Sequence, residues 1–176
     1  HPDNPDSKPY ADAHHQAQFE AWDMLAGRVD TELGGSEDCP DVLGRNYYPE
    51  HDWFVPIWPM SEGAPVGEPL HILLAQCWQR FRRPMLIAET GAEGDARAPW
   101  LQEISENVAV ALDQGIAVEG ISLYPVVEYP AWADDRRSPG PLLGLADPNG
   151  NRNLHEALAL VLRSQQIKFA TRNQTG

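Results

Sequence analysis

The chain has 176 residues, 42% of them hydrophobic, and a formal net charge of −13 at pH 7. The length suits one domain with a sizeable core, the acidic balance argues against nucleic acid as a partner, and no apolar run is long enough to span a membrane. The first residues lack the basic start and the apolar stretch of a signal peptide. We therefore expect a cytoplasmic protein with two reduced cysteines and, because no metal-ligand spacing is present, no metal or cofactor.

The first third of the chain is predicted to contain one helix and one strand. Residues 1–10 contain three prolines and are expected to form a loop. Residues 11–27 have apolar side chains at three- and four-residue spacing, which is typical of a helix. After a loop with glycine and proline, residues 41–49 are predicted to form a strand in which Asn46 and Tyr48 share one face.

The middle of the chain leads to a charged residue at the end of a buried strand. The segment 50–69 contains Trp53 and four prolines, and loops of that length are often functional. Residues 70–81 have one continuous apolar face and are predicted to be a helix. The short apolar run 85–88 is typical of a strand buried on both faces. It ends at Glu89, whose charge is costly there unless it is used or paired.

The last part of the chain continues the alternation of helices and strands. We expect a helix over about 100–112, a strand over 118–127 and a helix over 153–163 that begins with a capping box. The polar tail over 166–176 is expected to be frayed. This order predicts an α/β fold with parallel strands. Ligands bind at the carboxyl ends of such strands, so Glu89 becomes the first candidate for chemistry.

Three segments resemble, in the right order, motifs of family 1 glycoside hydrolases, the β-glucosidase-like retaining enzymes. They are Asp41-Val-Leu-Gly-Arg-Asn-Tyr-Tyr48, Arg80-Phe-Arg-Arg-Pro-Met-Leu-Ile-Ala-Glu-Thr-Gly91 and Gly120-Ile-Ser-Leu-Tyr-Pro-Val-Val-Glu-Tyr-Pro-Ala-Trp132. The resemblance covers about residues 11–163. It implies strands six to eight, with flanking helices, of a parallel (β/α)8 (TIM) barrel. Because a whole barrel needs about 250 residues, residues 1–176 are expected to form a single partial barrel domain.

The resemblance also assigns the chemistry. Retaining glycosidases use two carboxyl groups about 5 Å apart, one as nucleophile and one as acid and base. Glu89 takes the place of the nucleophile, whereas the acid/base residue of the family lies on a fourth strand that this chain does not contain. Glu50 and Glu128 are the nearby substitutes, and both are expected to be ordinary loop charges. The isolated chain is therefore expected to be inactive.

Five residues are expected to bind the carbohydrate substrate: Asn46, Tyr48, Tyr124, Trp132 and Trp53. The hydroxyl of Tyr48 could donate to Glu89 and keep it ionised, although Asn46 and Tyr48 could also simply fill the barrel interior. Tyr124 replaces the family's sugar-stacking Trp and could stack on a pyranose. Trp132 matches the family's Trp, and Trp53 either lines the sugar cleft or packs on the barrel rim.

Two residues depart from the family pattern. Ala131 stands where the family has a Glu that clamps sugar hydroxyls, so the resemblance does not extend to glucose or galactose specificity. Arg45 is expected on the helix-facing side of its strand, where it would need a buried partner.

Three functions remain open. The first is the C-terminal half of a retaining glycoside hydrolase, with a missing N-terminal half-barrel as partner. The second is a non-catalytic half-barrel that binds sugar or assembles, including by self-association, through its open sheet edges. The third is an unrelated α/β protein in which Glu89 is structural.

Overall fold

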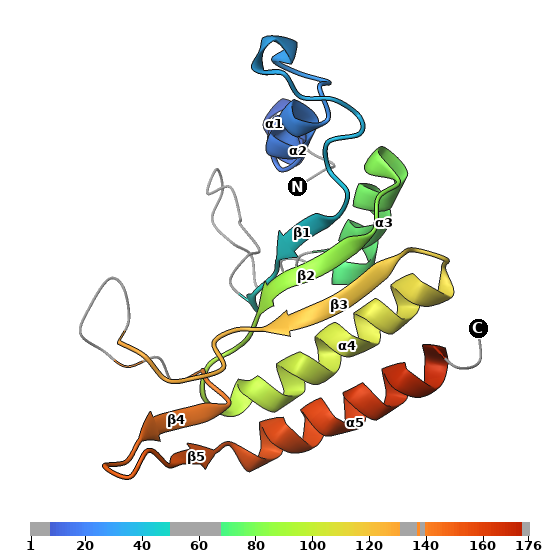
Figure 1. The fold of residues 1–176 in the computed structure, drawn as a ribbon. Helices are drawn as coiled ribbons and strands as arrows, with labels where there is room; N and C mark the ends of the chain where they lie inside the picture. Colours follow the sequence, from blue (N-terminus) through green and yellow to red (C-terminus); the bar gives the residue numbers. More distant parts are fainter. Residues whose placement is uncertain (1–7, 50–67, 131–136, 138–139, 174–176) are drawn as a thin grey trace. The chain divides into compact units, whose positions relative to one another are not determined.

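The computed structural model describes residues 8–49, 68–130, 137 and 140–173 (Figure 1). The chain divides into two compact units, 1–43 with 53–66 and 44–52 with 67–176. The first unit holds two short helices. The second holds a parallel sheet with its helices, and it contains the candidate site.

The first unit corrects two predictions. The expected single helix is split into α1 (Lys8–Ala17) and α2 (Glu20–Leu25). Helix α1 begins inside the segment that was predicted to be a loop, so the loop prediction is wrong for its last three residues. The break falls before Phe19, which is 2% exposed and whose N–H donates to the carbonyl of Gln16. This tight turn interrupts the helical pattern.

The second unit contains a three-stranded sheet in the order β1-β2-β3. Its strands are β1 (Leu43–Asn46), β2 (Met85–Thr90) and β3 (Val118–Leu123). All three strands point the same way (Figure 1), and the β2–β3 pairing is parallel. The prediction of a parallel α/β arrangement is therefore confirmed for these strands, although β1 and β3 are shorter than expected.

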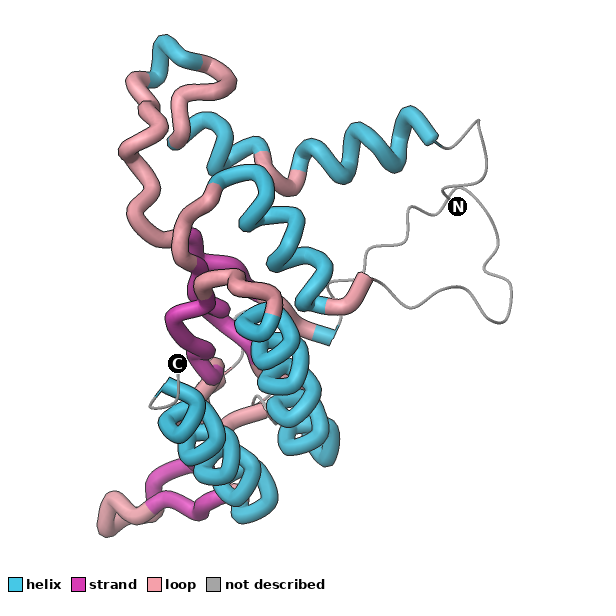
Figure 2. The backbone as a smooth tube through the Cα atoms, turned by 90° about the vertical axis from the view of Figure 1, so that its right-hand side faces the viewer, coloured by secondary structure: helices cyan, strands magenta, loops and turns pink. Residues whose placement is uncertain are grey.

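Helices connect the strands and cover the sheet. Helix α3 (Leu70–Phe81) has the predicted bounds, and α4 (Arg97–Asp113) begins before the predicted helix and ends one residue after it. Helices α3 and α5 (Glu156–Asn173) both pack beside α4, so the three form a row (Figures 1 and 2). The core consists of apolar side chains from this row and from the strands, including Leu74, Ile87 and Ile104, each 0% exposed.

The C-terminal part of the unit differs most from the prediction. Strands β4 (Leu143–Ala146) and β5 (Arg152–Leu154) form an antiparallel hairpin that the sequence pattern did not predict. Asn153 therefore lies in a strand and does not cap the last helix. A ring nitrogen of His155 accepts the N–H of Leu158 instead, at 3.1 Å. The tail predicted to be frayed is helical as far as Asn173.

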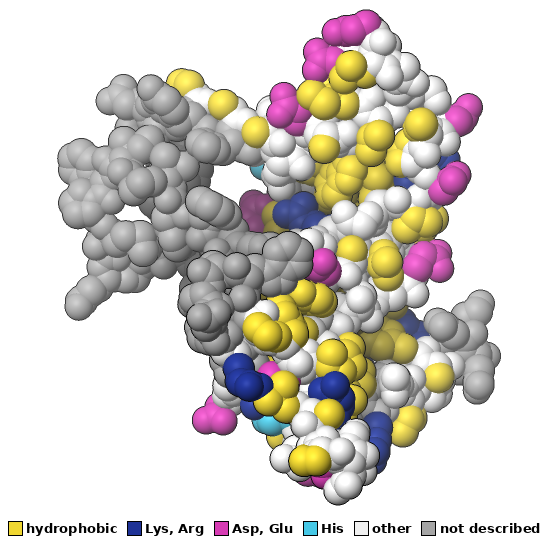
Figure 3. All heavy atoms as spheres, turned by 60° about the vertical axis from the view of Figure 1, so that its left-hand side comes forward, with side chains coloured by type: hydrophobic (Ala, Val, Ile, Leu, Met, Phe, Trp, Pro, Cys, Tyr) yellow, Lys and Arg dark blue, Asp and Glu magenta, His cyan; other side chains and the backbone are white. Residues whose placement is uncertain are grey.

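Acidic side chains occur at several places on the face shown in Figure 3. Some Asp and Glu side chains lie near one another at the top of this view, and the others lie singly farther down. Among the described residues, no group of three or more His, Cys, Asp or Glu side chains could hold a metal ion. None of the described helices is long and apolar enough to cross a membrane.

Candidate functional site

The two faces of β1 are distinguished by their contacts. On the helix-facing side, Nη1 of Arg45 donates to Sγ of Cys77 in α3 at 3.7 Å. The ring of Tyr47, just beyond β1, stacks on Trp100 of α4 with centroids 5.6 Å apart and planes 11° apart. Because successive side chains of an extended chain alternate, Tyr48 faces away from the helices.

Glu89 lies on the same face as Tyr48, at the carboxyl end of β2. The hydroxyl of Tyr48 donates to Oε2 of Glu89 at 3.0 Å, so the contact predicted from the sequence is confirmed. The next residue, Thr90, faces α4, because its hydroxyl accepts the indole N–H of Trp100 at 2.9 Å.

An irregularity in β2 produces this orientation. Ile87 is 0% exposed in the core, and strict alternation would place Glu89 on the same face as Ile87. The β2–β3 register shifts between Ile87 and Thr90. One extra residue in β2 turns the side chains that follow it to the other face of the strand. This explains why the Glu89 carboxylate lies on the face opposite the core.

Among the described residues, one side-chain hydrogen bond holds the carboxylate of Glu89. Oε2 accepts the Tyr48 hydroxyl, and no hydrogen bond reaches Oε1 from the described residues. Burial raises the pKa of Tyr48 well above its ordinary value, and the hydrogen bond to Glu89 and the negative charge of Glu89 raise it further. The phenol therefore stays protonated and remains a donor at neutral pH.

Backbone hydrogen bonds beyond the strands fix the neighbours of Glu89. The N–H of Tyr47 donates to the carbonyl of Glu89, and the N–H of Tyr124 donates to the carbonyl of Thr90, both at 2.9 Å. Gly91 permits the second approach, because a Cβ on this residue would lie 2.1 Å from the carbonyl oxygen of Tyr124. The carboxyl ends of the three strands thus bring these residues to one edge of the sheet.

A second phenol lies beside Tyr124. The hydroxyls of Tyr124 and Tyr129 are hydrogen-bonded at 3.1 Å, and the two rings have centroids 6.1 Å apart. The pKa of Tyr129 is raised, first by this hydrogen bond and then by burial and by the charges of Tyr124 and Glu89. Sequence reasoning did not single out Tyr129. The only available signal was its place five residues after Tyr124 in the same motif.

The other predicted residues are less informative. Asn46 is the last residue of β1 and is exposed, and within the described part of the chain no hydrogen bond joins it to Glu89. Trp53, Trp132 and the candidate base Glu50 lie outside the described residues, as does Ala131.

Glu128 is engaged with the hairpin rather than with Glu89. Its Oε2 accepts the N–H of Leu145 at 3.3 Å, and its Oε1 lies 3.7 Å from Nη1 of Arg137. These contacts fit the expectation of an ordinary loop charge and leave Glu89 as the candidate nucleophile.

The neighbour of the Arg45 guanidinium is the buried thiol of Cys77. Burial raises the pKa of the Cys77 thiol, although the Arg45 charge and hydrogen bond act in the opposite direction. Arg45 therefore faces a neutral thiol at neutral pH. Both cysteines are free, Cys39 exposed and Cys77 buried, as the sequence predicted.

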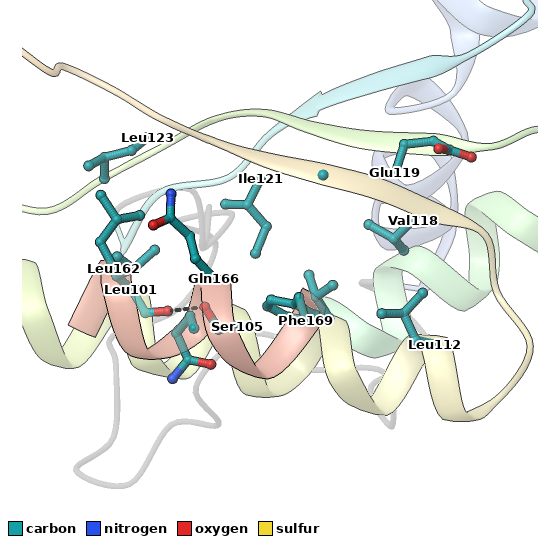
Figure 4. Close-up of a pocket in the computed structure, with 13 residues that line it drawn as sticks. Leu101, Ser105, Leu112, Val118, Glu119, Ile121, Leu123, Leu162, Gln166 and Phe169 are labelled. Atoms are coloured by element: carbon teal, nitrogen blue, oxygen red, sulfur yellow. Dashed lines mark hydrogen bonds between the residues drawn. The ribbon is translucent and has the colours of Figure 1, made fainter. Parts of the chain in front are cut away.

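A cavity of about 340 Å³ lies away from Glu89, between β3, α4 and α5 (Figure 4). Its walls are mostly apolar and include Leu101, Leu112, Val118, Ile121, Leu162 and Phe169. Residues 118–121 and 123 of β3, the last strand of the three-stranded sheet, form one of its walls. Its apolar lining and its place at a sheet edge indicate a packing surface rather than a sugar site.

Comparisons of sequence and of fold give different results. No protein-family model and no curated protein matches the sequence itself. The fold matches the hyperthermophilic β-glucosidase from Pyrococcus furiosus with a TM-score of 0.67 and 19% identity, over 94% of this chain and 39% of that one. A mutant β-glucosidase derived from a hyperthermophilic tetrameric structure matches with a TM-score of 0.65 and 20% identity, over 92% and 38% of the two chains.

The family 1 β-glucosidase from Thermotoga maritima matches with a TM-score of 0.55 and 14% identity, over 72% of this chain and 34% of that one. The chain spans about two fifths or less of the length of these structures. At such identities the likeness is one of fold. The resemblance predicted from the three motifs is thus confirmed at that level, and the chain shares its fold with part of the TIM-barrel β-glucosidases of family 1.

Proposed function

We propose that the chain is the C-terminal part of a retaining β-glycosidase and that Glu89 is its nucleophile. The observation that carries the proposal is the state of one carboxylate. Oε2 of Glu89 is held by Tyr48 at 3.0 Å, whereas Oε1 accepts no hydrogen bond from the described residues. A nucleophile must be held so that one oxygen can reach the anomeric carbon, and the hydrogen bond from Tyr48 to Oε2 supports such an orientation.

The reaction would follow the two-step course of retaining enzymes. Oε1 of Glu89 attacks the anomeric carbon while the bond to the leaving oxygen breaks, which gives a glycosyl ester. Water then attacks the same carbon and releases Glu89 as a carboxylate. The Tyr48 hydroxyl keeps Glu89 in place and stabilises its charge before attack and after release.

The acid/base carboxyl is assigned to another part of the barrel. In the proposed correspondence, β1, β2 and β3 are strands six, seven and eight, and the acid/base residue of the family lies on the fourth. Glu128 is bonded to Leu145 and close to Arg137, so it does not take this role. The isolated chain is accordingly proposed to be inactive on glycosides whose leaving group needs a proton.

The missing N-terminal half-barrel is the proposed partner, and the cavity at the β3 edge is its proposed docking place. A parallel strand laid along β3 would satisfy the backbone groups of that edge, and the helix next to it would fill the apolar cavity. The buried Oε1 of Gln165 lines this cavity and has no hydrogen-bond partner among the described residues. Leu160 and Ile167 of α5 are 64% and 69% exposed, which leaves a further apolar surface for a neighbour.

Covalent trapping tests the nucleophile. A 2-deoxy-2-fluoro-β-D-glucosyl fluoride carries a leaving group that needs no proton, so it can label the nucleophile without the acid residue. We expect mass spectrometry to find one glucosyl ester, on Glu89, in the chain alone or after addition of an N-terminal half-barrel. Glu89→Gln should abolish the label, and Glu128→Gln should keep it. A label on any other residue would refute the assignment.

The non-catalytic half-barrel remains the second candidate, because the same residues could bind a sugar without reaction. It predicts reversible binding of glycosides and no ester, even when an N-terminal half is present. Its self-associating form predicts a dimer in light scattering that a charged substitution in the cavity, Ile121→Lys, would dissociate.

A further inference from the structure

We propose that Tyr129 is a glycone-binding residue whose hydroxyl donates a hydrogen bond to a sugar oxygen held against Glu89. This inference rests on the proposed function and adds a residue that the three motifs did not assign. It makes the pair of phenols at the end of β3 a determinant of substrate specificity.

The position of Tyr124 is fixed by the sheet. Its N–H donates to the carbonyl of Thr90 at 2.9 Å, so its backbone lies beside the residue that follows Glu89. Its side chain is 36% exposed, and its hydroxyl reaches Tyr129 at 3.1 Å. The two phenols therefore form a hydrogen-bonded chain that starts next to the nucleophile.

Tyr129 is the free end of that chain. One hydrogen bond joins the two hydroxyls and uses one of their two protons, and within the described residues no second hydrogen bond uses the other proton. When Tyr129 donates to a sugar oxygen, the Tyr124 hydroxyl can donate to Tyr129 in turn, and such a chain of hydrogen bonds strengthens each of its members. The pair can therefore supply one donor to an oxygen that is bound beside Tyr129.

Two contacts keep the segment before Tyr129 in place. The N–H of Glu128 donates to the carbonyl of Leu143 at 2.9 Å, and the Glu128 carboxylate accepts the N–H of Leu145. The β4 strand thus supports the residue that precedes Tyr129. The raised pKa of Tyr129, to which the charge of Glu89 contributes, means that the phenol is a neutral donor at neutral pH.

A neutral donor selects substrates differently from a carboxylate. A carboxylate such as the Glu that Ala131 replaces requires hydroxyl donors on the sugar, whereas a phenol donor requires only an acceptor oxygen. The expected glycones therefore present a hydroxyl or an ether oxygen at this position, and a methyl ether should be tolerated there.

The test uses the kinetics of Glu89 labelling by the fluorinated glucosyl fluoride. Tyr129→Phe should raise the half-saturating concentration about five- to tenfold, the effect of one lost hydrogen bond, and leave the maximal labelling rate unchanged. Trp78→Phe, on α3, is the control, and it should change neither value. Unchanged saturation in Tyr129→Phe, or a change confined to the maximal rate, would overturn the inference.

If the wild-type protein is not labelled, the proposed nucleophile is contradicted, and the role of Tyr129 is tested by binding. Calorimetric titration with glucoimidazole then measures binding alone, and Tyr129→Phe should weaken it by the same factor. Equal binding by the variant, or no binding by the wild type, rejects the role of Tyr129.

An ultraviolet titration checks the phenol pair without any sugar. Tyr124→Phe should lower the pKa of Tyr129 toward its ordinary value, because the largest cause of its shift is the hydrogen bond that the two hydroxyls share. An unchanged Tyr129 pKa in this variant would show that the pair does not form in solution and would overturn the inference.

Discussion

The indole N–H of Trp100 donates a hydrogen bond to the hydroxyl of Thr90 at 2.9 Å. Thr90 follows Glu89 in β2, and neighbouring residues of a strand face opposite sides. Helix α4 therefore holds the candidate nucleophile in its orientation from the other side of the sheet.

Trp100→Phe should destabilise the protein and loosen Glu89. The substitution retains a ring to stack on Tyr47 but removes the donor to the buried hydroxyl of Thr90. We expect a loss of about 1–2 kcal/mol in the free energy of unfolding, measured by urea denaturation, and slower labelling of Glu89. Trp78→Phe, on α3, is the control and should leave the labelling rate unchanged. Equal labelling rates in both variants would contradict this role of Trp100.

Gly91→Ala should be among the most damaging single-methyl additions in the sheet. The new Cβ would lie 2.1 Å from the carbonyl oxygen of Tyr124, and a backbone atom cannot move away easily. We expect a loss of more than about 2 kcal/mol in urea denaturation. In Gly120→Ala the Cβ would meet only the flexible end of Leu86 at 3.3 Å, so this control should be nearly neutral. Similar stabilities for the two variants would refute the close approach.

Tyr48 should ionise well above the ordinary pKa of tyrosine in an ultraviolet titration. The high-pH absorbance change of Tyr48 should be absent in Tyr48→Phe. In Glu89→Gln the pKa of Tyr48 should fall only partly toward its ordinary value, because burial is the largest cause of its shift. Since the pKa is higher in the folded state, the stabilisation is complete below about pH 10, the unfolded value. It is lost as the pH rises through the folded-state pKa. A Tyr48 that titrates with the exposed tyrosines would be inconsistent with this site.

The two cysteines should react at very different rates with a thiol reagent. Cys39 is exposed, whereas Cys77 is 1% exposed and its thiol has a raised pKa, so it is rarely the reactive thiolate. We expect one fast equivalent in the native protein and the second only after addition of urea. Cys39→Ser should remove the fast phase. Two fast equivalents would show that the space between β1 and α3 is open to solvent.

Asp147 should stabilise the β4–β5 hairpin at neutral pH but not in acid. Its carboxylate accepts the side-chain amide of Asn151 and the backbone N–H groups of Asn151 and Asn149, which lowers its pKa. A lowered pKa means that the contribution is present above the unfolded value and is lost as the pH falls through the folded one. Carboxyl NMR of Asp147 should follow this titration, and Asp147→Ala should broaden the hairpin signals selectively. A pKa at the ordinary value would contradict it.

Local patterns predicted the elements whose signal lies within one segment. Helix α3 has the bounds given by its apolar face, and the Tyr48–Glu89 contact followed from strand alternation combined with the family motifs. The β4–β5 hairpin was missed although Asn149-Gly150 is a strong turn signal, because both strands are very short. Helix α5 was cut short because its last residues are polar, yet they continue a helix whose inner face packs on α4.

The rest of the site depended on contacts between distant segments. Arg45 faces the thiol of Cys77, thirty-two positions away in the sequence, and no local pattern identifies that neighbour. Tyr129 became a candidate only when its hydroxyl was found beside that of Tyr124. The roles of Asn46, Trp53 and Trp132, the cytoplasmic location and the single-domain organisation stay predictions.

In β2, burial and side-chain orientation depend on different features of the strand. The apolar residues of β2 specify burial, whereas the irregular step between Ile87 and Thr90 specifies which of two adjacent side chains reaches the site. A β2 strand with the same residues but with regular alternation would exchange the faces of the Glu89 carboxylate and the Thr90 hydroxyl without changing any polarity elsewhere. The backbone irregularity, rather than the identity of the apolar residues, sets the face on which the Glu89 side chain lies. Other apolar residues in this segment would therefore leave the carboxylate in the same place.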